Sequence, residues 1–413
     1  MKAGLLRYSI LQLLVPFNRE SLVYPPAANG IWQVAPPLDF NDALYAGWSQ
    51  IAVVKEIEVS NGVQLCRTYA HHPHIFYLHD TVYLTFSSAP ADEDSMGQDV
   101  RISVSKDRGL TWTHSNSLIP PAMLPSQTDP RNFTYWCDRS IVQRAWQPIG
   151  FVHLPEENEL YAVGLSASEA CPGGYQSAGK VAQRINKNGS AIGDPCWLLK
   201  NEYTTTQLYN ETIFGTKFSM RDCEKKSVIN SKLEEPDAVP AWGSWLYNHE
   251  LYAADGRYNM QEQTFATWFD DDDSPTGGYW QRFWRDISAT NNSLAVWLEY
   301  NESPNGDNWY PRVLEQYGNA IYKTNIPDGK TKQFFGRWEP DGARYLVSNP
   351  RHNDDLERQP LTIATSRGKD QVYKKAGVLR TNASRTIAPE TRNGYKNLGF
   401  QYPSTVQIGR AHV

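Results

Sequence analysis

The chain has 413 residues, of which 40% are hydrophobic and 12% aromatic, and its formal net charge at pH 7 is -5. A chain of this length can bury a large core as one big domain or as two ordinary ones. The small negative charge provides no broad basic surface, which argues against nucleic acid and against an anionic membrane as partners. Any acidic ligand must therefore meet a local cluster of arginine or histidine side chains.

The N-terminal residues and the sequons favour secretion. Lys2 precedes an apolar run like that of a secretory signal, although Arg7 interrupts it, so residues 1–30 are expected to be a signal or N-terminal segment. No apolar run reaches the length of a membrane span. Six Asn-x-Ser/Thr sequons indicate a secreted, extracellular glycoprotein. They start at Asn132, Asn188, Asn210, Asn291, Asn301 and Asn382.

Five cysteines leave the disulfide pairing open. They form no Cys-x-x-Cys pair, so the sequence indicates no zinc site or other metal centre. Their odd number implies either a free buried thiol or a partner lost from the chain.

The first elements predicted along the chain form a unit of four strands. "HIFYLHD" is a short apolar strand, His79 and Asp80 form a tight turn, and "TVYLTFSS" alternates as the next strand. "VRISVSKD" and "TWTHS" are expected to be the third and fourth strands. Four antiparallel strands in sequence make one blade of a β-propeller.

Similar units recur at intervals of roughly 40 to 50 residues, the spacing typical of propeller blades. They include "GFVHLPEENELYAVGLSA", "GSWLYNHELYAADGRY", "NSLAVWLEY" with "NAIYKTNI", and "RWEPDGARYLVSNP" with "PLTIATSRGKDQVYKKAGVL". No long window has helical periodicity. We predict an all-β fold over residues 31–407, a six- or seven-bladed β-propeller with seven blades favoured. A two-sheet sandwich is the alternative.

The C-terminal residues indicate a truncation. Residues 408–413, "IGRAHV", match the translation of a common sequencing adapter, and they follow "FQYPSTVQ", which resembles the opening of a strand. We expect residues 408–413 to be an artefact and the C-terminal blade to be incomplete.

A turn motif follows the predicted third strand. The pattern Ser-x-Asp-x-Gly-x-Thr-Trp, known as an Asp-box, is formed by Ser105, Asp107, Gly109, Thr111 and Trp112. In this pattern the aspartate accepts backbone N–H groups, the glycine takes a positive φ, and the tryptophan packs between neighbouring sheets. We predict a structural role as the turn between the third and fourth strands. "SRGKDQVY" near Ser366 resembles a diverged copy.

The motif orients the blade. If this turn lies at one end of the propeller, the loop between the second and third strands and the start of the innermost strand lie at the other end, which we call the mouth. "YAHHPH" and "SAPADEDSMGQ" then come together there. Ligand sites of propellers occur where the loops of all blades converge.

Three histidines near the mouth, His71, His72 and His74, form the densest histidine cluster of the chain. Because side chains alternate along a strand, His72 and His74 should share a face, with Pro73 stiffening the backbone. An imidazole titrates near neutral pH and can act as general base or acid. Hydrogen-bonded structural histidines are the alternative.

Arginines from several blades are placed near the mouth by the same reasoning. A guanidinium binds a carboxylate bidentately, so their convergence would suit an acidic ligand. The binding candidates are His71, Arg139, Arg144, Arg257, Asn349, Arg351, Arg358 and Gln401.

Acidic residues form two further groups. Asp270 to Asp273 are most simply a solvated hairpin tip, and a structural calcium ion there is an option that the pattern does not support. Glu93 and Asp94 lie at the mouth and could orient an arginine. No P-loop, GxSxG, HExxH or dinucleotide fingerprint occurs, and we expect no required cofactor.

The Asp-box, the first-blade pattern from "HHPHI" to "GQ", "YLVSNP" with "PL" and "ATS", and "GFQYPS" together resemble the sialidase-like propellers with neuraminidase-type repeats. Within that group the chain is most similar to fungal secreted polysaccharide lyases of the L-rhamnose-α-1,4-D-glucuronate type, which are seven-bladed. The resemblance covers roughly His71 to Gln407. The Phe/Tyr-Arg-Ile-Pro motif of sialidases is missing, which argues against sialidase activity.

The resemblance implies β-elimination next to a uronic acid in an acidic plant-type polysaccharide, with the protein acting as a monomer. Such an enzyme must neutralise the carboxylate, remove the C5 proton and protonate the departing C4 oxygen. By position, the base or acid is His72 or His74, with Tyr258 or Tyr402 opposite. Carboxylate recognition falls to Arg139, Arg144 and Arg257.

Two other classes stay open. A glycoside hydrolase on the same scaffold would need two carboxylic acids, or a tyrosine nucleophile with an acid partner. Its candidates, Glu93, Asp94 and Glu262, show no evident pairing. A non-catalytic sugar-binding propeller would keep the aromatic residues and tolerate loss of the histidines.

Overall fold

A computed structural model describes residues 30–34, 56–60, 63–67, 69–89, 98–119, 145–167, 179–199, 221–238, 251–252, 259–261, 263–272, 274–287, 295–306, 321–327, 329–350, 358, 360–367, 371–380 and 403–408. Within these residues the chain is almost entirely strand and turn, with a single helix, α3 (Lys226–Leu233). No described helix has the length and apolar character that crossing a membrane requires.

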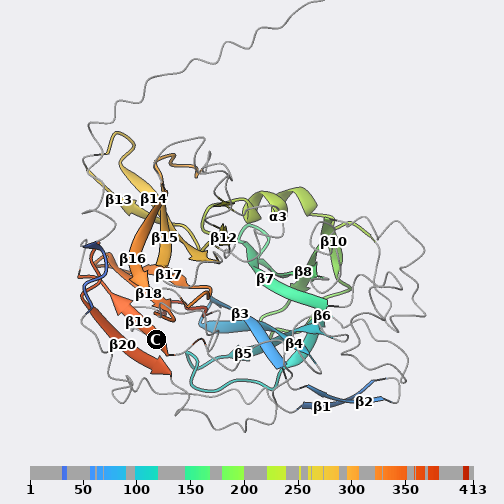
Figure 1. Cartoon of the computed structure of the whole chain (residues 1–413). Coiled ribbons are helices and arrows are strands. Elements are labelled where there is room, and N and C mark those ends of the chain that lie inside the picture. Colours follow the sequence, from blue (N-terminus) through green and yellow to red (C-terminus); the bar gives the residue numbers. More distant parts are fainter. Residues whose placement is uncertain are drawn as a thin grey trace, which may run out of the picture.

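Four antiparallel sheets lie around a common centre, with β3, β7 and β17 on their inner side (Figure 1). We number these sheets blades 1 to 4 in chain order. Blade 1 consists of β3 (Tyr69–Leu78), β4 (Thr81–Ala89), β5 (Asp99–Ser105) and β6 (Asn116–Ile119). Blade 2 consists of β7 (Ala145–Leu154), β8 (Glu159–Ala167), β9 (Lys180–Ile185) and β10 (Cys196–Leu199).

Blades 3 and 4 follow the same order of strands. Blade 3 consists of β13 (Thr267–Asp270), β14 (Gly278–Asp286), β15 (Ala295–Asn301) and β16 (Ile321–Pro327), and β11 (Leu251–Tyr252) and β12 (Asn259–Gln261) extend its sheet along β14. Blade 4 consists of β17 (Phe334–Trp338), β18 (Ala343–Ser348), β19 (Leu361–Thr365) and β20 (Lys375–Arg380). A separate hairpin is formed by β1 (Glu56–Ser60) and β2 (Val63–Arg67).

The propeller predicted from the repeats is confirmed, and the sandwich alternative is not. The expected number of six or seven blades is not reached, because the described residues form four. Of the stretch "GSWLYNHELYAADGRY", only β11 is described. The predicted strand opening at "FQYPSTVQ" is also corrected, since residues 403–407 have no strand conformation.

The turn between β3 and β4 is the one predicted from the sequence. His79 and Asp80 have φ angles of 48° and 59°, and two successive positive φ values define the type I′ turn that suits the twist of a hairpin. The Tyr77 hydroxyl donates to Asp80 Oδ1 at 2.7 Å. Local chemistry therefore fixes the pairing of these two strands.

The predicted turn after β5 is centred on Asp107. Its Oδ1 accepts the N–H of Thr111 at 2.8 Å and the hydroxyl of Ser105 at 2.7 Å. The Thr111 hydroxyl also donates to this carboxylate. Hydrogen bonds from Thr111, and then from Ser105, lower the pKa of Asp107 to about 2.

The second half of this turn runs further than expected. Gly109 has a φ of 88°, and half-buried Trp112 donates its indole N–H to the Gly109 carbonyl at 3.0 Å, so the ring closes over its own turn. Thr113 N–H donates to the Val104 carbonyl at 2.9 Å. The fourth strand therefore begins at Asn116, after "TWTHS", because the residues of that stretch complete the turn.

Blade 2 has a turn of the same design that the sequence pattern did not reveal. Asn186 Oδ1 accepts the N–H groups of Asn188 at 2.8 Å and of Ser190 at 3.0 Å. Gly189 has a φ of 79°. The bond from Ser190 spans four residues, as does the bond from Thr111 to Asp107. An asparagine amide here replaces the carboxylate.

This second turn also joins blades 1 and 2. A Cβ atom on Gly189 would lie 2.5 Å from Cγ2 of Val104, so only glycine fits. The Tyr83 hydroxyl donates to the Lys187 carbonyl at 3.3 Å. Between the two sheets, Phe76 and Phe151 stack with ring centroids 5.5 Å apart. The two blades thus share one apolar core.

Residues 30–34, drawn in dark blue in Figure 1, connect blades 3 and 4. Trp32 N–H donates to Asn325 Oδ1, and Asn325 Nδ2 donates back to the Trp32 carbonyl, both at 2.9 Å. Trp32 also forms a parallel bridge with Tyr373, and Ile31 is completely buried. This segment fills the junction between the outer part of blade 3 and blade 4.

Residues 403–408 connect blade 4 to blade 1. Gln407 exchanges two side-chain hydrogen bonds with the backbone of Glu339, each 2.9 Å long. Ser404 Oγ accepts the N–H of Ile75 in β3 at 3.3 Å. The segment therefore contacts β3 of blade 1 and the turn that follows β17 in blade 4.

We call residues 221–238 the strap, because they connect blade 2 to blade 3. A disulfide joins Cys223 to Cys196 of β10, and Ile229 and Leu233 of α3 pack into the core of blade 2. At its other end, the Pro236 carbonyl accepts the N–H of Ala266 at 3.3 Å.

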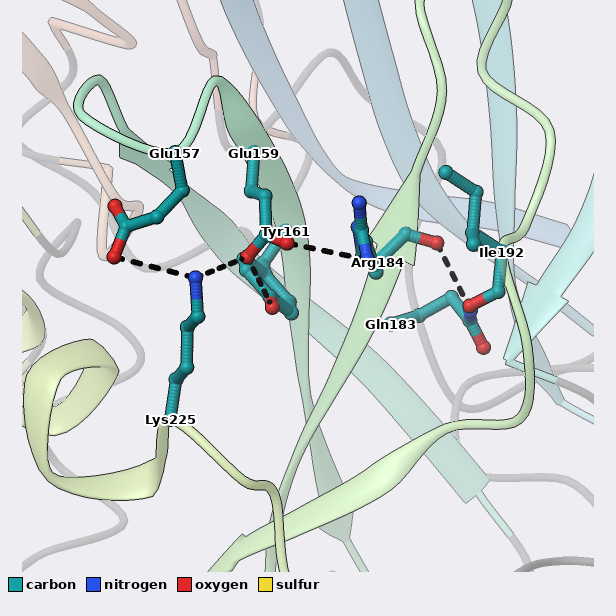
Figure 2. Close-up of polar contacts among 7 residues, drawn as sticks. All are labelled: Glu157, Glu159, Tyr161, Gln183, Arg184, Ile192 and Lys225. Carbon is teal, nitrogen blue, oxygen red and sulfur yellow. Dashed lines mark hydrogen bonds and ion pairs between the residues drawn. The ribbon is translucent and has the colours of Figure 1, made fainter.

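Charged residues attach the strap to blade 2 (Figure 2). Lys225 Nζ lies 2.8 Å from Glu159 Oε2 and 3.2 Å from Glu157 Oε1. Arg184 and Tyr161 also contact the Glu159 carboxylate, at 3.1 and 2.9 Å. Burial alone would raise the pKa of Glu159, but the bonds from Lys225 and Tyr161 and the charge of Arg184 lower it. Burial, followed by the bond to Glu159, raises the pKa of Tyr161 to about 12.

Replacing Gly189 tests the contact between blades 1 and 2. Gly193→Ala is the matched control, because Gly193 also has a positive φ, 69°, but has open space around it. We expect the control to lower the free energy of unfolding by about 1–2 kcal/mol and Gly189→Ala to lower it by about 1–3 kcal/mol more, because of the clash. Urea unfolding followed by tryptophan fluorescence measures both. Equal losses would contradict the packing described.

Glu159→Gln tests the attachment of the strap, with exposed Glu156→Gln as its control. At pH 7 we expect the Glu159 variant to lose about 1 kcal/mol of unfolding free energy and the control to lose almost nothing. The lowered pKa stabilises the fold only while the carboxylate is ionised, so the loss should shrink as the pH falls toward about 4. A loss that does not depend on pH would argue against the ion pairs.

Candidate functional site

The structure places the histidines at the predicted end of blade 1. His71 pairs with Ser87 near the end of β4, whereas Ser105, where the Asp107 turn begins, pairs with Val82 near its start. The two features therefore lie at opposite ends of the blade. The loop predicted to join the histidines at the mouth is described only at its two ends, Ala89 and residue 98.

A β-bulge, and not simple alternation, arranges the histidines. His71 pairs with Ser87 and His74 with Thr85, so three steps along β3 match two along β4. His71 and His74 therefore share a face. His72 lies within the bulge and has a φ of 53°, a left-handed conformation that few residues other than glycine adopt. Simple alternation does not hold through this bulge, so the prediction that it places His72 and His74 on one face was wrong.

Ser87 determines which nitrogen of His72 carries the proton. The Ser87 hydroxyl donates its one hydrogen to the His71 carbonyl at 3.0 Å. Its oxygen also lies 3.1 Å from His72 Nδ1, so in that contact Nδ1 must be the donor. In the neutral ring, Nε2 then carries the lone pair. The His71 and His72 ring centroids are 3.9 Å apart.

Burial keeps His74 uncharged. His74 is 3% exposed. Loss of solvation is the largest cause that moves its pKa well below the ordinary value, and the charges of His72 and Lys332 act in the same direction. Lys332 is itself buried and lies two residues before β17, the innermost strand of blade 4. The structure thus brings an imidazole cluster from blade 1 within electrostatic reach of an ammonium group from blade 4.

A second cation, Arg358, lies in the loop between β18 and β19 and is 4% exposed. Asn349 Nδ2 donates to the carbonyls of Arg358 and Pro360 at 2.8 and 3.0 Å. Asn349 therefore holds this loop in place with both of its amide hydrogens, and substrate binding by Asn349 stays a prediction. The loop that contains Arg358 joins the second and third strands of blade 4, and a role of Arg358 in substrate binding stays a prediction.

The innermost strand of blade 2 repeats the arrangement. Buried Gln147 lies just before a bulge between Pro148 and Gly150, as His71 lies just before the bulge in β3. Gln98 Nε2 donates to the Trp146 carbonyl at 3.1 Å. Polar side chains thus occupy the start of the innermost strand in both blades.

The remaining predicted site residues lie outside the described part of the chain. They are Arg139, Arg144, Arg257, Tyr258, Arg351, Gln401 and Tyr402, together with Glu93, Asp94 and Glu262 of the hydrolase alternative.

Two residues of the site were missed by the sequence reasoning. Ser87 was assigned only to a strand, although the polar pair in "TFSS" was a signal that one face becomes polar. Lys332 was not considered, although "KTKQ" places cations directly before an apolar inner strand. Neither pattern is specific. The partners of Ser87 lie at a bulge that the sequence does not reveal, and Lys332 acts on His74, which is far away in the sequence.

Of the acidic run at 270–273, residues 270–272 are described, and they lie at the predicted hairpin tip between β13 and β14. Asp271 N–H donates to the Gly277 carbonyl at 3.1 Å, and Trp268 donates its indole N–H to Asp270 at 3.0 Å. Among the described residues, no group of three or more His, Cys, Asp or Glu side chains is arranged to hold a metal ion. The suggested calcium site therefore gains no support from the described residues.

Comparison with known proteins agrees with the propeller. The family model described as "Beta-prop_BT_1020:-like, N-terminal beta propeller" matches residues 49–249, just under half of the chain. A solved structure named "Sialidase" is 20% identical and has a TM-score of 0.52, and the match covers 87% of this chain and 30% of that one. The chain therefore has a β-propeller fold, which it shares with this sialidase structure.

Other solved structures are more distant. The Hadza microbial sialidase Hz136 is 9% identical with a TM-score of 0.42, and the match covers 76% of this chain and 59% of that one. The Trypanosoma rangeli sialidase is 12% identical with a TM-score of 0.39, and the match covers 76% of this chain and 50% of that one. This chain thus spans less than two thirds of each of these three structures. No curated protein gives a significant match.

The lowered pKa of His74 predicts a loss of stability in mild acid. Below about pH 6.5 the unfolded chain gains a proton at this position before the folded chain does, so the free energy of unfolding falls as the pH falls. His74→Gln should weaken this dependence, whereas exposed His114→Gln should leave it unchanged. Urea unfolding between pH 7.5 and 5 measures the slopes. Identical slopes for both variants would show that His74 is not held neutral.

Proposed function

We propose that the protein is a secreted carbohydrate-active enzyme that acts at the mouth on an acidic plant-type saccharide, by β-elimination next to a uronic acid. One observation carries the proposal: His72 and His74 lie together at the start of β3, where the charge of Lys332 acts on His74. A neutral imidazole that can accept a proton, with an ammonium group nearby, suits this elimination, which needs a proton acceptor and a partner for the carboxylate.

Each group has a defined task in this reaction. The base takes the C5 proton, the C5–H electron pair forms the C4=C5 double bond, the C4–O bond breaks, and the leaving oxygen takes up a proton. His72 is the candidate base, because its bond to Ser87 leaves the lone pair on Nε2. Lys332 is the candidate partner of the substrate carboxylate. The arginines and tyrosines outside the described residues stay candidates for carboxylate binding and for proton transfer.

Substrate access sets a requirement for this proposal. His71, His72 and His74 are between 2% and 5% exposed. A sugar chain can reach these rings only if the residues that cover them move aside, as happens in enzymes whose loops open and close over the site.

The disulfide between Cys196 and Cys223 supports an extracellular location, because such bonds persist in oxidising compartments. Hydrolysis is the second candidate reaction, since several solved structures with detectable similarity are named sialidases. The monomeric state and the independence from a cofactor are parts of the proposal that separate measurements must address.

The deciding experiment is incubation with gum arabic and with rhamnosyl-glucuronate oligosaccharides. Ultraviolet absorbance of an unsaturated uronate and release of free sugar are followed together. Both signals together support elimination. Sugar release without the chromophore means hydrolysis and directs attention to Glu93, Asp94 and Glu262. Binding without either product means a sugar-binding propeller.

Variants then test the residues of the site. We expect His72→Asn to lower kcat by about 10²–10⁴-fold, the usual contribution of a general base. Ser87→Ala should shift the pH profile of kcat, because it removes the group that orients the ring. His114→Asn, which replaces an exposed residue, is the control and should leave kcat and its pH profile unchanged. Full activity of His72→Asn would exclude it as the base.

A further inference from the structure

Two of the six sequons lie in described residues, and their surroundings are opposite in kind. Asn188-Gly189-Ser190 forms the tip of the turn between β9 and β10, and Asn301-Glu302-Ser303 begins in β15. We propose that Asn188 is an N-glycosylation site and that Asn301 remains unmodified. This proposal requires passage through the secretory pathway but not the enzymatic activity proposed above.

The side chain of Asn188 is exposed on a turn whose backbone is held from within. Asn186 Oδ1 accepts the backbone N–H groups of Asn188 and Ser190. Gly189 packs closely against Val104. Ser190, the third residue of the sequon, is exposed as well. Both the acceptor amide and the hydroxyl that the transferring enzyme must recognise therefore point away from the core.

The contact that Asn188 makes is compatible with modification. Its Oδ1 accepts a hydrogen bond from Lys106 Nζ at 2.7 Å, which connects the turns of blades 1 and 2. Glycosylation forms a bond from Asn188 Nδ2 to the anomeric carbon of an oligosaccharide. One amide proton leaves, and the lipid diphosphate that carried the oligosaccharide departs. The product keeps its amide oxygen, so the bond from Lys106 can persist.

Asn301 has no comparable freedom. It is 7% exposed, lies opposite Trp280 across β14 and β15, and accepts the Ser303 N–H at 2.8 Å through its Oδ1. A glycan attached there during synthesis would have to be accommodated within a buried strand. Chains modified at Asn301 should therefore fail to form blade 3.

A glycan on Asn188 would leave the mouth open. The turn from Asn186 to Ser190 connects the third and fourth strands of blade 2, so it lies at the same end as the Asp107 turn and opposite the histidines. Loss of the glycan should therefore leave turnover of any saccharide unchanged.

The test expresses the full chain behind a signal peptide in a secreting eukaryotic host. Peptides from medium and lysate are mapped by mass spectrometry after enzymatic deglycosylation in heavy-oxygen water, which marks each formerly modified asparagine. We expect Asn188 to be marked in most of the folded protein and Asn301 to be unmarked. Asn301→Gln should leave the glycan mass unchanged.

Ser190→Ala is the decisive variant, because it removes the sequon while leaving the Asn188 side chain and its bond to Lys106. It should lose one glycan and keep its unfolding midpoint within the small range of a surface substitution. An unmarked Asn188 in secreted, folded protein would overturn the proposal, and so would a marked Asn301 in that fraction. Neither glycan mapping nor the unfolding midpoint depends on activity. The glycosylation result can therefore be interpreted even if the proposed enzymatic function fails.

Discussion

Burial of both faces of each sheet is the constraint on which the structure depends. Every residue of β5 and of β15 is buried, whereas a strand in a sheet with one wet face alternates between buried and exposed side chains. A single blade therefore cannot be stable by itself, because one of its apolar faces would remain in water. Each blade needs a neighbour, and blades 1 and 2 share one apolar core while blades 3 and 4 share another.

Because both faces of the sheets are buried, polar side chains at the mouth cost folding free energy and are held in defined positions by their hydrogen bonds. His72 adopts a backbone conformation that costs about 1–3 kcal/mol for a residue other than glycine. Its contact with Ser87, and the bond from Ser87 to the His71 carbonyl, partly offset this cost by satisfying buried polar atoms. The bulge thus concentrates three imidazoles where an ordinary strand would have turned one of them away.

Features set by neighbouring residues could be predicted from the sequence, and features set by distant contacts could not. The His79-Asp80 turn and the hydrogen bonds of Asp107 were predictable because each depends on residues within four positions. The turn at Asn186 was missed because the Asp-box pattern requires aspartate. An asparagine amide oxygen can accept the same N–H groups as a carboxylate, but it does not match the pattern. The bulge at His72 depends on the register of a partner strand.

The distant partners of the site illustrate the same limit. Lys332 affects His74 only because blade 4 and blade 1 meet near the centre, and no local pattern contains that information. The pairing of Cys196 with Cys223 likewise needed the position of α3. The prediction of six or seven blades was not met, since the described residues form four, because spacing identifies the repeating unit more reliably than it identifies how many units the chain forms.

The junction made by residues 30–34 has a consequence for the order in which the protein can be built. Trp32 hydrogen-bonds to Asn325, which lies 293 positions later in the chain. At synthesis rates of about 5–20 residues per second, Trp32 waits roughly 15–60 s for this partner. Blades 1 and 2 can pair on the ribosome during that time, but the junction of blades 3 and 4 closes only after Asn325 and Tyr373 have been synthesised. Residues 30–34 must therefore avoid aggregation by themselves, or be bound by a chaperone, until blades 3 and 4 have formed.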